Sequence, residues 1–301
     1  RRWRLPFMME WVVYKRLRID FLIILLILIG CTSTANQTKV EKNTYNPIEV
    51  TIPIGEAKII KFALPENSGI LKCKGKEYPY YNSEGVGLFF LEVSYFSTPE
   101  NFSCEFLGKE DYTVIKVKSI DKEFPFEQLR VNRKRVFLNE KDSARVQKEQ
   151  LMLNKLYSSS ESYPLFTGGF QLPVKTKITS KYGKKRLFNN KKQGQHLGTD
   201  FRARVGKEIR VTQAGKVVYA GDLFYTGGTV IVDHGLGVFS VYGHLSKLKT
   251  FDGEYVPKGA IIGLAGKTGR VTGPHLHWGV KVHGNYIDGV GLVDHSKDLS
   301  L

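Results

Sequence analysis

Short runs of apolar and β-favouring residues recur in the N-terminal half of the chain and predict β-strands. Pro, Gly and Asn separate the clearest of these runs, which occupy residues 48–52, 57–62, 87–93 and 112–117. Short runs of this kind that are bounded by turn residues are typical of β-strands. We therefore expect a small β-sandwich-like accessory domain over residues 46–120.

Short strands and glycine turns also fill the C-terminal half, from Gly168 onward. The clearest runs are residues 216–221, 228–232 and 238–242. No stretch of ten residues there has helical periodicity, so we expect antiparallel β-structure whose loops wall an open groove. We place this domain at residues 166–290, with a tail at residues 291–301, and the chain as a whole is predicted to be mainly β.

One segment of the mature chain, residues 142–157, has the periodicity of an α-helix. The positions that recur at helical spacing are Val146, Gln150, Leu153 and Tyr157. Asp142 or Ser143 is a suitable N-cap residue. We interpret this helix as a connector within a linker of residues 121–165. The loop after it, residues 158–164, is a candidate to lie across the groove and occlude it.

An apolar run near the N-terminus predicts export. Residues 21–29 are all apolar, and they follow the positive charges of Lys15, Arg16 and Arg18. This run is too short to span a bilayer and has the right length for the core of a signal peptide. We expect residues 1–30 to be a signal peptide whose translation starts at Met8 or Met9.

The residues that close this run, Leu28-Ile29-Gly30-Cys31, resemble the processing box of bacterial lipoproteins. The resemblance implies cleavage before Cys31 and lipidation of its sulfur, with enough acyl chains for a stable membrane anchor. An uncleaved anchor and a free thiol are the alternatives. Residues 31–45 then form a polar tether. The expected location is the cell envelope, on the periplasmic or extracellular side of a bacterial membrane.

Composition and charge narrow the choice of partner. The chain has 301 residues, 42% hydrophobic and 25% charged, which suits two globular domains. Its net charge of +16 suits an anionic partner: nucleic acid, an anionic membrane or an anionic cell wall. No nucleic-acid-binding motif is present, so we expect no nucleic-acid partner and favour the cell wall.

Two cysteines besides Cys31 lie in the predicted accessory domain. Export to an oxidising compartment would favour a disulfide between Cys73 and Cys104. Closing a loop of about 30 residues would stabilise the domain by about 3–4 kcal/mol. Two buried reduced thiols are the alternative.

The candidate chemistry begins at Gly273-Pro274-His275-Leu276-His277-Trp278. Side chains at positions i and i+2 of a strand leave the same face, so His275 and His277 are expected to project together. The intervening Leu276 and the following Trp278 would then face the packed side.

A second pair, His196 and Asp200, lies upstream. Gly194 and Gly198 beside them disfavour a helix and favour a loop that runs into a strand. Two imidazoles and one carboxylate are the ligand set of an open catalytic zinc site. A remaining histidine next to the metal could act as general base, and His244 is a further candidate.

At these residues the chain resembles the lysostaphin/LytM-type zinc metallopeptidases, which cut peptidoglycan peptides. Six segments carry the resemblance in family order: residues 178–183, 195–201, 232–237, 242–246, 262–269 and 272–277. In that family the residues that match His196, Asp200 and His277 bind the metal, and those that match His244 and His275 are catalytic. The resemblance implies one Zn²⁺ ion and a metal-activated water that hydrolyses peptidoglycan stems or cross-bridges.

Further expectations concern the surroundings of this site. Asp233 and backbone carbonyls are candidates to orient the ligand imidazoles. Tyr182, Phe188 and Tyr225 are candidates to line the groove. One departure from the family pattern is Asp288-Gly289, where an Asp-Pro step is common.

Two other functions stay open. Some relatives are not enzymes and act as wall-binding activators or scaffolds for other cell-wall hydrolases. Such relatives usually lack ligand residues, whereas all five positions are filled here, which favours an enzyme. A transport-linked lipoprotein with a repurposed domain is the third interpretation.

Overall fold

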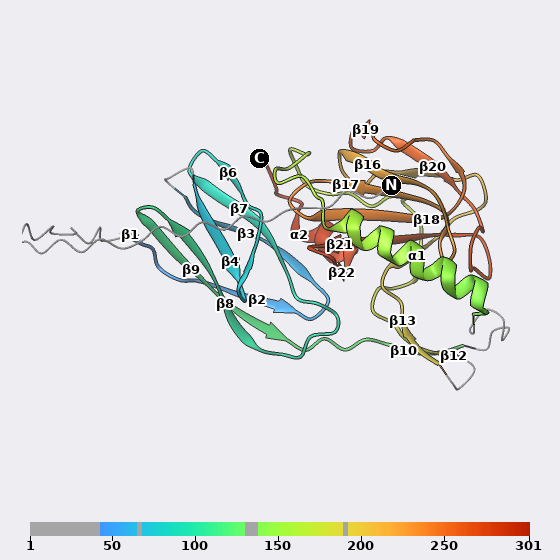
Figure 1. Cartoon of the computed structure of the whole chain (residues 1–301), viewed down its shortest axis with the longest axis horizontal. Coiled ribbons are helices and arrows are strands. Elements are labelled where there is room, and N and C mark those ends of the chain that lie inside the picture. The colour runs from blue at the N-terminus through green and yellow to red at the C-terminus, as the bar shows by residue number, and fades with distance from the viewer. Residues whose placement is uncertain (1–42, 65–67, 130–137, 189–191) are drawn as a thin grey trace, which may run out of the picture. The chain divides into compact units, whose positions relative to one another are not determined.

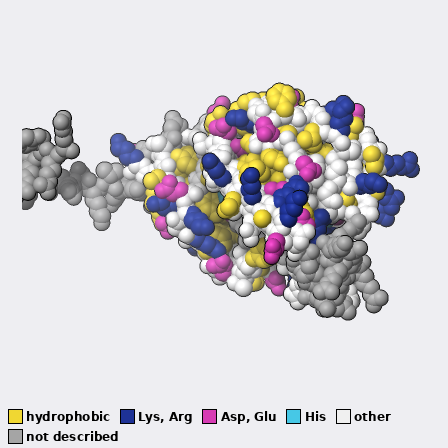
Figure 2. Space-filling view, turned by 45° about the vertical axis from the view of Figure 1, so that its right-hand side comes forward, with side chains coloured by type: hydrophobic (Ala, Val, Ile, Leu, Met, Phe, Trp, Pro, Cys, Tyr) yellow, Lys and Arg dark blue, Asp and Glu magenta, His cyan; other side chains and the backbone are white. Residues whose placement is uncertain are grey.

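The computed structural model describes much of the chain, in the residue ranges 43–64, 68–129, 138–188 and 192–301 (Figure 1). The predicted signal peptide, Cys31 and most of the predicted tether lie outside the described residues. Among the residues described, no helix combines the length and the apolar character needed to cross a membrane. On the face shown in Figure 2, Lys and Arg side chains are widely spread, with Asp and Glu side chains among them.

Two β-sheets form the N-terminal half. The larger contains β1 (Asn43–Thr44), β2 (Ile48–Pro53), β4 (Gly69–Cys73), β5 (Lys76–Glu77), β8 (Asn101–Gly108) and β9 (Asp111–Ile120). Its strand order is β1-β9-β8-β4-β5, and β2 pairs with β9 in parallel. The smaller sheet has the order β3-β7-β6 and contains β3 (Ala57–Ala63), β6 (Tyr81–Ser83) and β7 (Val86–Glu92).

These two sheets bury a common apolar core, so the sandwich-like prediction is confirmed. Buried and more exposed residues alternate along β9, as expected for a strand with one packed face. Ile52 and Ile115 from the larger sheet and Phe89 from the smaller one are fully buried in the same cluster. Cys73 and Cys104 lie directly opposite each other on β4 and β8, and their sulfur atoms are bonded.

The C-terminal half is built around one large sheet. Its strands are β11 (Ile178–Ser180), β14 (Thr199–Arg202), β15 (Glu208–Arg210), β16 (Gly215–Leu223), β17 (Gly227–Asp233), β18 (Val238–Leu248), β19 (Tyr255–Val256), β20 (Ile261–Ala265), β21 (His275–Val282) and β22 (Asn285–Ile287). The main path runs β11-β14-β21-β18-β17-β16-β19, and all its pairs are antiparallel. Strand β18 also pairs with β20, and this central strand is almost wholly buried from Val238 to Leu245.

The predicted helix is present as α1 (Glu140–Tyr157) and runs along the C-terminal sheet (Figure 1). Its N-cap is Asn139, whose side chain accepts a hydrogen bond from the backbone of Asp142, so the predicted caps were wrong by three or four residues. One face of the helix packs against the C-terminal sheet, where Leu153 and Tyr157 contact a small apolar cluster that contains Phe239.

The N-terminal sheets and the C-terminal sheet share a core rather than being joined only by a linker. Phe90 on β7 packs edge to face against Phe166 and Phe170. Residues of the predicted linker also form β10 (Phe126–Leu129). This strand pairs in parallel with β12 (Lys185–Phe188), which pairs antiparallel with β13 (Lys192–Gln195) to make a small fourth sheet.

The Asp288-Gly289 step has a local explanation. Asp288 caps the short helix α2 (Gly289–His295), because its side chain accepts hydrogen bonds from the backbone of Val290 and Gly291. A Cβ atom at Gly289 would lie 2.7 Å from a methyl group of Val280 and 2.9 Å from the ring of Trp278. Glycine is therefore required by packing at this position.

Candidate metal centre

Strand register brings the distant candidate residues together. Asp200 on β14 lies directly opposite His277 on β21, and His277 also lies opposite Gly243 on β18. His275 stands two residues before His277, so both project from one face of β21. The other face is packed as predicted, with Leu276 and Trp278 almost completely buried. His196 precedes β14 in a loop, which confirms the interpretation from the neighbouring glycines.

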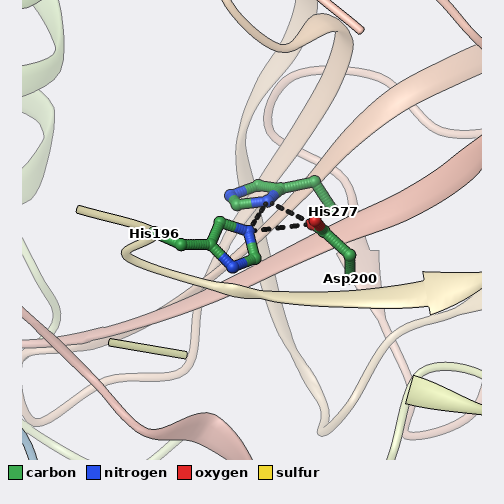
Figure 3. A group of neighbouring side chains, drawn as sticks. All are labelled: His196, Asp200 and His277. Carbon is green, nitrogen blue, oxygen red and sulfur yellow. Dashed lines mark hydrogen bonds and ion pairs between the residues drawn. The ribbon is translucent and has the colours of Figure 1, made fainter. Parts of the chain in front are cut away.

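His196, Asp200 and His277 converge on one small volume (Figure 3). His196 Nε2 lies 3.0 Å from Asp200 Oδ1 and 3.3 Å from His277 Nδ1, and His277 Nδ1 lies 2.9 Å from the same Oδ1. Atoms that share one tetrahedral zinc ion lie about 3.3 Å apart, given the usual bond lengths. The three donor atoms are therefore spaced as such a site requires.

The hydrogen bonds of His196 support a cation between these atoms. Its Nδ1 lies 3.0 Å from the carbonyl oxygen of Lys181, which can only accept, so Nδ1 carries the proton. Burial lowers the pKa of His196, so the ring is neutral and Nε2 presents a lone pair. That lone pair faces the carboxylate of Asp200 at 3.0 Å. Two electron-pair donors at this distance fit a metal ion placed between them.

Asp200 is held in its ionised form. Burial raises the pKa of its carboxyl group, but the adjacent imidazoles of His196 and His277 outweigh burial and keep that pKa well below its ordinary value. A metal ligand must be deprotonated, so this carboxylate needs no further preparation to bind a cation.

Gly198 makes room for one of the ligand rings. A Cβ atom at this position would lie 2.5 Å from Cε1 and 2.7 Å from Nε2 of His277. The absence of a side chain lets the His277 ring turn its Nδ1 toward Asp200. The residues present therefore fit a zinc ion in donor type, spacing and available space.

The two remaining histidines stand beside this group. His275 Nδ1 donates to the carbonyl of Gly273, and its Nε2 lies 3.6 Å from Asp200 Oδ1. His244 Nδ1 donates to the carbonyl of Thr268, and its ring centroid lies 4.8 Å from that of His275. Each imidazole therefore has one nitrogen bound to the backbone and the other available to the site.

His244 also has unusual backbone geometry. Its φ angle is 63°, in the left-handed region that non-glycine residues rarely adopt. The pairing of β18 with β17 and with β20 is irregular around this residue, and its backbone N–H bonds Thr226. Burial and the neighbouring His277 and His275 lower the pKa of His244 to about 4, so this ring is neutral at neutral pH. Strained residues of this kind cluster at functional sites.

The surroundings of the site agree only in part with the sequence-based expectations. Backbone carbonyls accept hydrogen bonds from His196, His244 and His275, as expected. The other candidate, Asp233, is at the far end of β17, where it bonds Ser160 and the backbone of Glu161. Tyr182 is buried, donates to the carbonyl of Tyr286 and packs against Phe124, so it does not line a groove. The Phe188 side chain lies outside the described part of the structure.

Tyr225 and the loop of residues 158–164 have distinct positions. Tyr225 is 44% exposed and adjoins Thr226, whose carbonyl accepts from His244, so it lies near the site as expected. The loop packs on the turn between β17 and β18, where Leu236 N donates to Glu161 O. Six residues of β18 separate the end of that turn, at Val238, from His244, which is about 20 Å at the rise of a strand. The loop packs there instead of across the site.

Sequence reasoning missed Arg186, whose Nη2 lies 3.8 Å from Asp200 Oδ2. It also missed Ser180, whose hydroxyl lies 3.2 Å from His196 Nδ1. Ser180 belongs to the segment that resembles the family, so its place near His196 offered a signal. Arg186 offered none, because it stands in a run of several basic residues.

Comparison with known proteins shows what the chain is similar to. Residues 194–289 match the model of Peptidase family M23, and this range contains all five candidate residues. A crystal structure described as a peptidase M23 from Pseudomonas aeruginosa aligns with a TM-score of 0.63 and 25% identity. The alignment covers 83% of this chain and 96% of that chain, so it extends well beyond residues 194–289.

Two curated relatives are similar to part of the chain. The peptidoglycan DD-endopeptidase ShyA of Vibrio cholerae is 38% identical over 120 residues, which are 40% of this chain and 28% of that protein. The DD-carboxypeptidase/endopeptidase Mpg of Neisseria meningitidis is 33% identical over 127 residues, which are 42% of this chain and 29% of that protein. The chain thus spans less than a third of the length of these relatives.

Proposed function

We propose that this protein is a zinc-dependent endopeptidase that hydrolyses peptide bonds in peptidoglycan. The match of residues 194–289 to the model of Peptidase family M23 supports this proposal. One observation carries the proposal. His196, Asp200 and His277 present three donor atoms within 4.8 Å of one another, and two more imidazoles stand beside them. A ligand set together with neighbouring proton acceptors is what metal-assisted hydrolysis requires.

His196, Asp200 and His277 would hold the ion. When bound, zinc supplies Lewis-acid activation of water or of the scissile carbonyl. His275 has its Nδ1 proton committed to Gly273, so its Nε2 is free to accept a proton from the attacking water. His244 has the same arrangement through Thr268 and offers a second acceptor. The ring that takes this proton can then deliver it to the leaving amine.

The comparisons favour one bond type. The matched relatives from Vibrio and Neisseria are described as DD-endopeptidase and DD-carboxypeptidase/endopeptidase. We therefore propose that this protein cuts the D,D-peptide bonds that cross-link stem peptides. The net charge of +16 suits work on an anionic cell wall.

The proposed substrate implies a place in the cell envelope. We propose that Cys31 is lipidated and anchors the protein to a bacterial membrane, as its position after an apolar run indicates. Metabolic labelling with a fatty-acid analogue tests this part. Loss of the label in a Cys31→Ala variant is expected, and a label that persists would refute lipidation at Cys31.

Digestion of isolated peptidoglycan tests the enzymatic activity. The mature protein is incubated with purified sacculi, and mass spectrometry identifies the released muropeptides. Cross-linked dimers should be converted to monomers, a chelator should abolish the conversion, and zinc should restore it. Equal conversion with and without chelator would refute a metal-dependent enzyme.

Variants separate an enzyme from a non-catalytic activator. His277→Ala removes a metal ligand and should reduce turnover by at least 100-fold. A protein that only activates another hydrolase would keep its effect in this variant, and the wild type alone would release no monomers.

A further inference from the structure

Arg186 on β12 joins the candidate metal centre to a segment outside the matched family range. Its Nη2 lies 3.8 Å from Asp200 Oδ2 and donates to the Ser180 hydroxyl at 3.1 Å. Its Nε donates to Glu127 Oε2 at 3.2 Å. The guanidinium group therefore lies between the carboxylate of the metal centre and a second carboxylate on β10.

The two oxygens of Asp200 have different surroundings. Oδ1 faces His196, His277 and His275 at 2.9 to 3.6 Å, whereas Oδ2 faces Arg186. A carboxylate can rotate and exchange its oxygens unless something fixes its plane. A guanidinium group beside Oδ2 favours the orientation in which Oδ1 points at the ligand imidazoles.

Glu127 fixes Arg186 in turn. Strand β10 pairs in parallel with β12, and Glu127 lies opposite Arg186 in this register. The same carboxylate also contacts Lys184 Nζ at 3.4 Å. These side chains are largely buried, since Arg186, Glu127 and Asp200 are 20%, 30% and 12% exposed. Solvent therefore weakens these contacts less than it weakens surface ion pairs.

We propose that Arg186 is a positioning residue that holds Asp200 in its metal-binding orientation, and that Glu127 on β10 holds Arg186 in place. The inference rests on the proposed zinc site. It makes the zinc affinity of the C-terminal domain depend on a strand that precedes helix α1. Neither residue lies within residues 194–289, the range that matches the family model.

Zinc affinity, measured by competition with a chromogenic chelator, tests the proposal without reference to catalysis. The mature protein is compared with Arg186→Gln, Arg186→Lys and Glu127→Gln. Outer contacts of metal ligands typically change affinity by about 10- to 100-fold, and we expect that loss for Arg186→Gln. Glu127→Gln should lower zinc affinity by about 3- to 10-fold. Arg186→Lys should lower it less than Arg186→Gln does, because lysine keeps the positive charge but lacks the planar guanidinium group with its several N–H donors.

A double variant checks that both residues act by one route. If Glu127 acts through Arg186, the loss in Arg186→Gln combined with Glu127→Gln should equal the loss in Arg186→Gln alone. Arg210→Gln is the matched control, because Arg210 forms an exposed pair with Glu208 away from the site. It should leave zinc affinity within twofold of the wild type.

The outcomes distinguish this inference from the proposed function. Zinc affinity within twofold of the wild type for both Arg186→Gln and Glu127→Gln would overturn the inference and leave the peptidase proposal intact. A wild type that binds zinc but cleaves no peptidoglycan would overturn the function alone, and one that binds no zinc would overturn both. If Arg186→Gln fails to fold by circular dichroism, Glu127→Gln decides the question.

Discussion

At the scale of single residues, the candidate metal centre depends on the lack of a side chain at Gly198. Alanine there would place a methyl group 2.5 Å from His277 Cε1 and 2.8 Å from the carbonyl of Trp278. The carbonyl belongs to the backbone of β21 and cannot move easily, so the His277 ring must turn away. We expect Gly198→Ala to weaken zinc binding by about 10- to 100-fold, with a comparable loss of peptidoglycan cleavage.

Gly291→Ala is the control for this substitution. Gly291 lies in α2, and the nearest atom to a Cβ there is 3.8 Å away. Both variants are titrated with zinc against a chelator. Wild-type affinity in Gly198→Ala would show that His277 does not need the space beside Gly198.

How far the sequence predicts this site differs from residue to residue. Residue types and spacing pointed to two histidines and one carboxylate, the family resemblance selected His196, Asp200 and His277, and the fold does bring these three together. Arg186 could not be found this way, because its contact with Asp200 depends on a parallel pairing between β10 and β12. Tyr182 was wrongly predicted to line the groove, because an aromatic residue next to a motif can be buried and contribute only to packing.

At the scale of elements, the bond between Cys73 and Cys104 connects neighbouring strands β4 and β8 of the N-terminal sheet. The two cysteines are 31 residues apart, so the disulfide closes a loop of that length in the unfolded chain. Loss of the bond increases the conformational entropy of the unfolded chain. Loop-closure entropy predicts that a Cys73→Ser, Cys104→Ser double variant loses about 3–4 kcal/mol of stability. Denaturant unfolding of the oxidised protein and of the variant measures the difference.

The single variant Cys73→Ser serves as a comparison, because it also lacks the bond. It should unfold at the same denaturant concentration as the double variant. An unchanged unfolding midpoint in both variants would mean that the disulfide does not form in the purified protein.

The sequence predicted where strands lie better than it predicted which strands pair. The periodic runs at residues 48–52, 57–62 and 112–117 became β2, β3 and β9 with ends shifted by few residues. Strand β10 was assigned to a linker because four residues carry too little periodic signal. Its position depends on hydrogen bonds to β12, which is distant in the sequence, so the residues of β10 alone do not reveal the pairing.

At the scale of the whole molecule, the N-terminal sheets and the C-terminal sheet meet through a buried carboxyl group. Glu92 on β7 is 8% exposed, and its Oε1 accepts from Asn285 on β22 at 3.1 Å. Tyr78 lies at 3.4 Å from the same oxygen and packs against His283. Among the described residues, Glu92 Oε2 has no hydrogen-bond partner. Sequence could not reveal this contact, because a glutamate at the end of a strand is usually exposed.

Burial raises the pKa of Glu92 to about 8, although its hydrogen bonds and Lys76 act in the opposite direction. The group is therefore neutral in the folded protein at pH values where it is ionised in the unfolded chain. Its contribution to stability is fully present below the unfolded pKa of 4.5 and is lost as the pH rises through about 8. The loss amounts to about 3–5 kcal/mol, since each pKa unit corresponds to about 1.4 kcal/mol.

Glu92→Gln should remove this dependence, because an amide keeps the shape and neutrality of the protonated carboxyl group. Other buried groups also make stability depend on pH: burial lowers the pKa of His234 and His283 to about 4 and that of Lys281 to about 8. The difference between variant and wild type cancels their effects. Urea unfolding from pH 4.5 to 8.5 should show the variant gaining stability over the wild type as the pH rises. A difference that stays constant over this range would mean that Glu92 ionises at its ordinary pKa and that this contact is open to water.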